Sequence, residues 1–210
     1  MKIYDISQVI KVGIPVWPGD SAFNFESTWS LDMECPVNVG KLSLSTHTGS
    51  HADAPLHYGD GGDDIATVSL IPYIGKAYVV DARGCGALVE PHHIEAQLPE
   101  RVERVLVRTF QEYPHDIWPD GFSAFHFETI HMLAKKGCLL VGIDTPSVDP
   151  ESSKDLPSHN AIKAHKMAIL EGLVLDSIDF GAYELIALPL KIAQGDASPV
   201  RAILREWQGD

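Results

Sequence analysis

Several short segments of the chain predict β-strands, because their apolar and polar residues alternate or their apolar residues run without a break. Alternation with a period of two places every second side chain on one face of a sheet, whereas a short unbroken apolar run is typical of a buried strand. Residues 41–46 alternate, and residues 104–108 form an unbroken run between two arginines. The predicted strands span residues 3–7, 23–29, 41–46, 77–81, 104–108 and 138–143.

Helix signals lie between these strands. Pro91 suits the first position of a helix, which we expect to reach about Leu98. Residues 127–136 also look helical, with Lys135 in the last turn and Gly137 as the stop. The alternation of strands and helices predicts an α/β fold.

Length and charge narrow the class of protein. The chain has 210 residues and 45% hydrophobic content, which suits one globular domain over residues 1–210. The formal net charge of -13 argues against nucleic acid or an anionic membrane as the main partner, because both need clustered Lys and Arg. The amino terminus has no signal-peptide core, and no apolar run approaches the ~18 residues of a membrane span. We therefore expect a cytoplasmic protein.

The three cysteines do not indicate a disulfide framework. Cys35, Cys85 and Cys138 are odd in number, widely spaced and lack a CxxC pair, so a cysteine zinc site is not supported either. We expect reduced, buried thiols.

Residues 47–57, His-Thr-Gly-Ser-His-Ala-Asp-Ala-Pro-Leu-His, concentrate the candidate chemistry. With 10 histidines in 210 residues, eleven positions should hold about half a histidine, yet this window holds three and an aspartate. Imidazole and carboxylate groups suit zinc or a similar first-row ion, and three protein ligands leave a position for water. A site with such an open position is usually catalytic.

The spacing of His47 and His51 would put both imidazoles on one face of a helix. A helix is nevertheless disfavoured, because Gly49 and Pro55 interrupt the segment and Pro55 biases Ala54 away from the helical region. We therefore predict that the strand at residues 41–46 runs into an irregular loop.

Such a loop can turn His47, His51 and Asp53 toward one point, because Gly49 can adopt a backbone conformation that other residues avoid. His57 lies just beyond these three residues, so it can remain free of metal and act as a general acid and base. For each residue alone, a structural role is the alternative. The histidines could be hydrogen-bonded loop residues, and Asp53 could form an Asx turn. All four together favour a metal site.

The same eleven residues resemble the signature of the metal-dependent cyclase family, and more closely that of its bacterial kynurenine formamidases. Similar stretches cover nearly the whole chain, at residues 16–20, 35–40, 142–150, 156–159, 169–172, 183–190 and 196–200. One departure is Ser50, where the family usually has threonine, and the hydroxyl is kept. The resemblance implies a single-domain swivelling β/β/α, cyclase-like fold with a mixed central sheet and flanking helices.

The resemblance also implies the ligand set and the substrate contact. It implies two Zn2+ ions per subunit, with His47, His51, Asp53 and Glu171 on one ion, His159 on the other, and Asp53 and Glu171 bridging. It makes His57 the catalytic acid and base. It turns Trp17 toward the substrate, although from residue type alone we would place a tryptophan in the core.

Spacing alone would not have selected His159 and Glu171. Twelve residues on one helix span ~18 Å, whereas paired metal ions lie ~3.5–4 Å apart. If both residues bind, the helix expected around residues 161–167 must end before Glu171 and the chain must fold back. Asp144 follows a predicted strand, where it can line a site or equally cap a turn.

The activity implied by the resemblance is hydrolysis of N-formyl-L-kynurenine to L-kynurenine and formate by a metal-activated water, in a homodimer. Two alternatives stay open. One is a related hydrolase of the same family acting on isatin or another aryl amide. The other is a metal-binding protein without catalysis, which would have no need of a metal-free His57.

Overall fold

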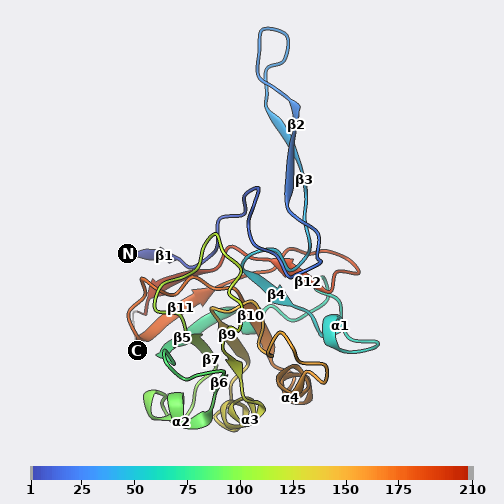
Figure 1. Cartoon of the computed structure of the whole chain (residues 1–210). Coiled ribbons are helices and arrows are strands. Elements are labelled where there is room, and N and C mark those ends of the chain that lie inside the picture. Colours follow the sequence, from blue (N-terminus) through green and yellow to red (C-terminus); the bar gives the residue numbers. More distant parts are fainter. Residues whose placement is uncertain (1, 208–210) are drawn as a thin grey trace.

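A nine-stranded mixed sheet organises the computed structural model, which describes residues 2–207 (Figure 1). Its strands are β1 (Ile3–Asp5), β4 (His51–Asp53), β5 (Ile74–Asp81), β7 (Arg104–Arg108), β9 (Leu140–Ile143), β10 (Ala168–Glu171), β11 (Gly181–Ile186), β12 (Ala197–Pro199) and β13 (Ile203–Glu206). Their spatial order is β1-β13-β11-β5-β7-β9-β10-β4-β12. The central strands β5, β7, β9 and β10 are parallel, and the pairings outside them are antiparallel.

The helices are short and flank this sheet. They are α1 (Pro55–Tyr58), α2 (Pro91–Ile94), α3 (Phe127–Lys135) and α4 (Pro157–His165), with the 3-10 turns η1 (Ile71–Tyr73) and η2 (Glu95–Gln97) and a small ladder of β6 (Leu88–Val89) with β8 (Ala124–Phe125). Helices α2, α3 and α4 lie together along one side of the sheet in Figure 1. Among the described residues, no helix combines the length and apolar character needed to cross a bilayer.

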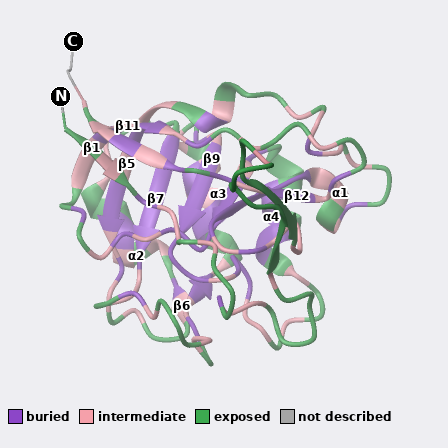
Figure 2. Cartoon of the chain, turned by 90° about the horizontal axis from the view of Figure 1, so that it is seen from above, coloured by how far each residue is buried: buried purple, intermediate pink, exposed green. Residues whose placement is uncertain are grey.

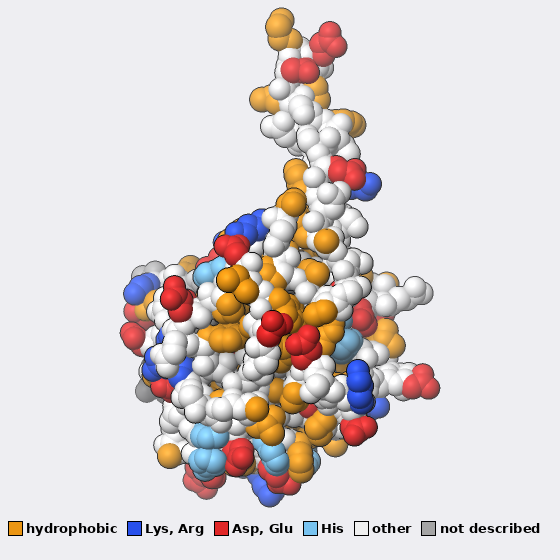
Figure 3. Space-filling model, in the orientation of Figure 1, with side chains coloured by type: hydrophobic (Ala, Val, Ile, Leu, Met, Phe, Trp, Pro, Cys, Tyr) orange, Lys and Arg blue, Asp and Glu red, His pale blue; other side chains and the backbone are white. Residues whose placement is uncertain are grey.

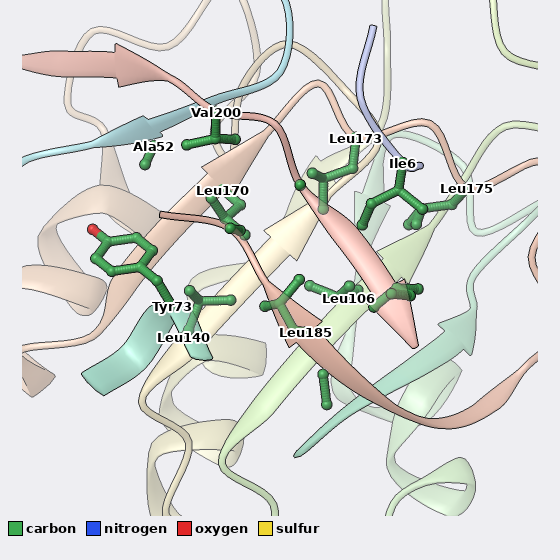
Figure 4. Packing of buried hydrophobic residues seen from close by; sticks show 14 of the residues in the cluster. Ile6, Ala52, Tyr73, Leu106, Leu140, Leu170, Leu173, Leu175, Leu185 and Val200 are labelled. Carbon is green, nitrogen blue, oxygen red and sulfur yellow. The ribbon is translucent and has the colours of Figure 1, made fainter. Parts of the chain in front are cut away.

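Alternate residues of β7 show how the sheet separates two cores. Val105 and Val107 pack into the cluster shared with the helices, whereas Leu106 points into the cluster on the other face. That second cluster joins Ala52 of β4 to Leu204 of β13, near opposite ends of the strand order, so the sheet curls around it (Figure 4). Figure 2 shows the central strands as a buried band.

Most expected elements are confirmed, as is the α/β fold with a mixed sheet and flanking helices. The strand at residues 104–108 forms as expected, the strand at residues 138–143 begins at Leu140, and the helix at residues 127–136 ends one residue early. The helix expected from Pro91 to Leu98 divides into α2 and η2. The irregular loop expected after residues 41–46 is wrong in part, because His51–Asp53 forms the strand β4.

The cysteines are free thiols, as expected. Cys138 is buried, but Cys35 and Cys85 are partly exposed, so the expectation of burial is wrong for two of the three. Both lie in connections between strands, and Cys85 packs at the margin of the helix-side cluster, where it is only partly covered.

A two-stranded hairpin stands away from this body. It consists of β2 (Asn24–Trp29) paired antiparallel with β3 (Val39–Ser43), and every residue of both strands is exposed. Figures 1 and 3 show it as an arm that projects from the sheet and carries apolar side chains along its length. Its exposed large apolar residues are Phe25, Trp29, Leu31, Met33, Val37, Val39 and Leu42.

Candidate metal centre

Strand pairing brings three of the sequence-predicted residues onto one face of the sheet. His51 and Asp53 are two apart on β4, so their side chains point to the same side. In the antiparallel register of β10 with β4, Glu171 lies opposite His51, and residues directly opposed share a face. Their face is the one that the helices cover, because Ile169, two residues before Glu171, packs in the helix-side cluster.

The chain folds back to bring His159 to the same place. His159 is the third residue of α4, which starts at Pro157, and the helix ends at His165 before a left-handed residue, Lys166 (φ 54°). The chain then enters β10, which ends at Glu171. The expectation that the helix ends before Glu171 is therefore confirmed.

The remaining predicted residues come from connections around β4. His47 precedes the strand, and Gly49 between them has φ +69°, as its predicted role requires. His57 lies on α1, which directly follows β4. The Ser50 hydroxyl donates a 2.6 Å hydrogen bond to the carbonyl of Gly172, so it ties the segment before β4 to the end of β10.

Two carboxylates span the gap between the imidazoles. Asp53 Oδ1 lies 3.2 Å from His47 Nδ1 and 3.4 Å from His51 Nε2, while Asp53 Oδ2 lies 3.5 Å from His159 Nε2. Glu171 Oε2 lies 3.2 Å from His51 Nε2, and Glu171 Oε1 lies 3.9 Å from His159 Nε2. Each carboxylate therefore faces His51 with one oxygen and His159 with the other.

Each imidazole that faces these carboxylates is held by its other ring nitrogen. The contacts are His51 Nδ1 to the Gly49 carbonyl at 2.9 Å, His159 Nδ1 to Asp149 Oδ2 at 2.7 Å and His47 Nε2 to Asp196 Oδ2 at 3.0 Å. An N–H donated outward leaves the inward nitrogen with its lone pair, which is the arrangement that metal-ligating histidines show. Asp149 is fixed in turn, because it accepts from the backbone N–H groups of Ser158 and His159.

Four buried polar atoms at the centre lack a hydrogen-bond partner among residues 2–207: both carboxylate oxygens of Asp53, His51 Nε2 and His159 Nε2. A buried carboxylate without donors is costly unless a cation compensates it. The donors are imidazole nitrogens and carboxylate oxygens, which suit Zn2+ and other first-row divalent ions. The residues therefore fit a divalent metal.

The pKa values of the cluster favour protonated imidazoles beside an ionised Asp53 carboxylate. Burial opposes protonation of His159, but contacts with Asp149 and Asp53 outweigh it and raise the His159 pKa to about 10. Burial likewise opposes protonation of His47, and Asp53 and Asp196 raise the His47 pKa to about 9. Burial would raise the pKa of Asp53, yet contacts with His159 and His47 hold it well below its usual value. Metal ions and protons would compete for these imidazoles.

His57 stands at the open side of the cluster. Its side chain is 34% exposed, and its Nδ1 lies 3.4 Å from Asp196 Oδ2. Burial would raise the pKa of Asp196, but hydrogen bonds from His47 and Thr46 lower it to about 2, so an ionised carboxylate faces His57. One nitrogen of His57 also lies within 4.8 Å of ligand atoms of Asp53 and His159.

A cavity of about 360 Å³ opens onto the cluster, and His47, His51, His57, His159 and Glu171 line it. Trp17 lines the same cavity and is 37% exposed, rather than lying in the core. Its ring makes edge contacts with Trp118 and Phe122, at centroid distances of 5.5 Å and 6.3 Å. Tyr113 also lines the cavity, so one wall is aromatic.

Several residues around the site were not predicted from the sequence. Asp149 and Asp196 both orient imidazoles, and both lie in stretches that carry the family resemblance, where acidic residues near strand ends are the usable signal. Trp118 and Tyr113 come from a connection with two prolines between residues 113 and 119, a composition typical of an ordered loop. The indole Nε1 of Trp118 is buried without a hydrogen-bond partner in the described part of the chain.

Asp144 does not line the cavity. It accepts hydrogen bonds from the Thr109 N–H, the Thr109 hydroxyl and the Phe110 N–H at 2.7–2.9 Å. Burial raises its pKa to about 6 in spite of these bonds. Of its two open interpretations, capping a turn is the one that the contacts support.

The chain resembles known proteins in both sequence and fold. Residues 4–150 match a family model described as "Putative cyclase". The kynurenine formamidase of Maricaulis maris (strain MCS10) is 50% identical over 205 residues, which cover 98% of either chain. A solved structure titled as a potential metal-dependent hydrolase with cyclase activity is 26% identical, with a TM-score of 0.84 over 97% of this chain and 96% of that one. Isatin hydrolase A from Labrenzia aggregata is 22% identical, with a TM-score of 0.82 over 97% and 93%, and shares the fold.

Proposed function

Because this chain belongs to the cyclase family, we propose that it hydrolyses N-formyl-L-kynurenine to L-kynurenine and formate, a step of tryptophan breakdown. The single observation that carries the proposal is the convergence of two buried carboxylates on inward-facing imidazole nitrogens beside an aromatic cavity. A relative named kynurenine formamidase, 50% identical over nearly the full length, supports the choice of substrate. On this proposal residues 1–210 form one hydrolase domain, and the enzyme acts in the cytoplasm.

We propose that the cluster holds two Zn2+ ions. His47, His51, Asp53 and Glu171 would hold one, His159 the other, and the two carboxylates would be shared. The support is that each carboxylate faces both His51 and His159. When bound, the ions supply Lewis acidity and lower the pKa of water. Asp149, Asp196 and the Gly49 carbonyl keep the imidazoles in the tautomers that ligation requires.

His57 is the proton carrier in this proposal. Asp196 Oδ2 faces its Nδ1, which leaves Nε2 to accept a proton from the attacking water and return it to the departing nitrogen. An aryl amine departs more readily than an alkyl amine, because the ring delocalises the nitrogen lone pair. One histidine that relays the proton is then sufficient for the departure of the amine.

The aromatic wall positions the substrate ring. Trp17 is braced edge-on by Trp118 and Phe122, so its indole keeps a fixed orientation for stacking on an aryl group. No Lys or Arg lines this cavity among the described residues. Within one chain, recognition therefore relies on ring packing and on the metal centre rather than on a cationic clamp.

We propose a homodimer in which the β2–β3 hairpin is the contact arm. Seven large apolar side chains are exposed on it, and Met33 is fully exposed. An exposed apolar stretch of this extent marks an interaction surface on a protein that is otherwise ordinary in composition. A second copy of the chain is the partner that the family resemblance implies.

One assay tests the activity. Purified protein should hydrolyse N-formylkynurenine, lose turnover after exhaustive chelation and regain it with Zn2+, and elemental analysis should give close to two metals per chain. Isatin is the comparison substrate, because the isatin hydrolases share the fold. Faster turnover of isatin would favour that alternative. Protein that binds metal but hydrolyses neither substrate would support the non-catalytic one.

A further inference from the structure

A second cavity, of about 690 Å³, lies at the opposite end of the central strands from the metal centre. Its lining includes Lys76 near the start of β5, Arg101 just before β7 and Gly137 just before β9. Glu171, in contrast, ends β10, which runs parallel to β9. The two cavities therefore lie at opposite ends of the central parallel strands, and they share no lining residue.

This second cavity gathers positive charge in a chain that is strongly acidic. Four of the 16 Lys and Arg residues line it, although the formal net charge is -13. They are Lys76, Arg101, Lys135 and Lys136. No carboxylate lies within ion-pair distance of any of these four in the described part of the chain.

Two nearby acids are paired elsewhere, and two more, Glu95 and Glu128, line a neighbouring pocket with Lys135 and Lys136 without an ion pair to either lysine. Glu103, the acidic residue in the lining, pairs at 2.8 Å with Arg104, whose side chain is buried. Glu184 lies opposite Lys76 across the β5–β11 pairing, but it pairs with Arg205. The lining therefore carries four cationic side chains and one anionic side chain, which is an excess of positive charge.

Aromatic and apolar groups share the lining with these cations. The Lys76 ammonium lies 5.1 Å from the ring centre of Trp207 and 5.7 Å from that of Tyr78, which holds it over the cavity. Pro99 and Val102 add apolar surface. Clustered ammonium groups suit a phosphate as point charges, and Arg101 offers a planar fork.

We propose that this cavity binds a small molecule that carries a planar ring and a phosphate group, of the class of nucleoside phosphates. The phosphate would lie among Arg101, Lys135 and Lys136, and the ring against Trp207 and Tyr78. The site is independent of the proposed hydrolysis, because it uses none of the residues of the metal centre.

The test is isothermal titration calorimetry of the full chain with adenosine monophosphate, adenosine and inorganic phosphate, each titrated separately. We expect adenosine monophosphate to bind with a Kd of about 1 mM or tighter, and both fragments to bind at least tenfold more weakly. The doubly reversed variant Arg101→Glu with Lys135→Glu should weaken that binding by at least tenfold. Both side chains are exposed, so the fold should tolerate the change.

The matched control is Lys154→Glu with Lys191→Glu, which changes the net charge equally at exposed positions outside both cavities. It should bind like the unchanged chain. If the control and the variant lost affinity for adenosine monophosphate equally, the loss would come from overall charge, and the proposal would be overturned. Adenosine binding as tightly as adenosine monophosphate, or no saturable binding of the latter, would also overturn it.

Discussion

The metal-ligand cluster and the β2–β3 hairpin depart from the usual distribution of side chains in opposite ways. In the cluster, Asp53, Glu171 and His159 are charged or polar and almost fully buried. In the hairpin, Trp29 and Met33 are large and apolar yet 60% and 104% exposed. Folded chains normally bury apolar groups and leave unpaired charges in water, so both regions present surfaces that the chain alone does not satisfy.

The difference between them is in how firmly each region is held. The cluster is fixed by hydrogen bonds to Asp149, Asp196 and Gly49 and by strand pairing on both sides of β4. Within residues 2–207, the strands of the hairpin pair only with each other, and all of their residues are exposed. A rigid polar cluster suits metal ions, which need ligands at fixed positions. An exposed apolar arm suits contact with the surface of another protein chain.

The largest expected effect comes from the cluster. Glu171→Gln keeps the shape of the side chain but removes a charge that faces both His51 and His159. If the metals supply several kcal/mol of transition-state stabilisation, kcat/KM for N-formylkynurenine should fall by about 10³–10⁴-fold, and metal content should fall below two per chain. Elemental analysis and steady-state kinetics measure both. A variant with full metal and more than a tenth of the activity would contradict the ligand role.

A smaller loss is expected from His57→Ala, which removes the proton carrier but no proposed ligand. Turnover should drop by about 10²–10³-fold, while metal content and circular dichroism stay unchanged. The control is His92→Ala, at an exposed histidine outside the cavity. Loss of metal in the His57 variant would make it a ligand, and unaltered turnover would remove it from the reaction.

The hairpin is tested by placing a charge on its apolar surface. Trp29→Asp with Met33→Glu should weaken self-association by about 100-fold, because loss of an apolar anchor at an interface costs more than about 1 kcal/mol and this variant loses two. Sedimentation velocity over a range of concentrations measures this. Ile71→Glu is the control, at a 70% exposed apolar residue of η1. A chain that is monomeric before substitution, or equally dimeric after it, would remove the arm from the proposed interface.

Asp149→Asn tests how much the rigidity of the cluster contributes. The carboxylate holds His159 through Nδ1 without facing the other carboxylates, so its loss should lower metal affinity by about 10–100-fold. Competition with a zinc chelator gives the affinity, and excess Zn2+ should restore turnover. Unchanged affinity would show that packing alone orients His159.

The smallest effect is expected at Trp17, which lies in the cavity but outside the cluster. Trp17→Ala should raise KM about tenfold with little change in kcat, because it removes a stacking surface and leaves the chemistry intact. Trp17→Phe should recover most of the affinity. An unaltered KM for the alanine variant would place the ring outside the binding site.

Local patterns predicted the parts of the fold that local forces decide. The unbroken apolar run at residues 104–108 gave β7, and Lys135 with Gly137 marked the end of α3. Strand β4 escaped prediction because three residues, His-Ala-Asp, show no usable periodicity. Its extended conformation comes from pairing with β10 and β12.

The residues of the candidate site likewise fall into those that local sequence predicts and those that it does not. His47, His51, Asp53 and His57 stand out because they are close in sequence, whereas His159 and Glu171 required a family resemblance. Their meeting depends on a crossover through α4, which no local spacing encodes. Asp149 and Asp196 were overlooked because they orient imidazoles from outside the proposed ligand set and show no ligand spacing of their own.

The antiparallel register of β4 with β10 makes the centre intolerant of changes in strand length. His51 opposes Glu171 and Asp53 opposes Ile169, so loss or gain of one residue in either strand would rotate a carboxylate to the opposite side of the sheet. Substitutions at these positions can weaken the centre by degrees, whereas insertion or deletion of a single residue would abolish it. Natural variants should therefore vary in length at the hairpin tip long before they vary in length here.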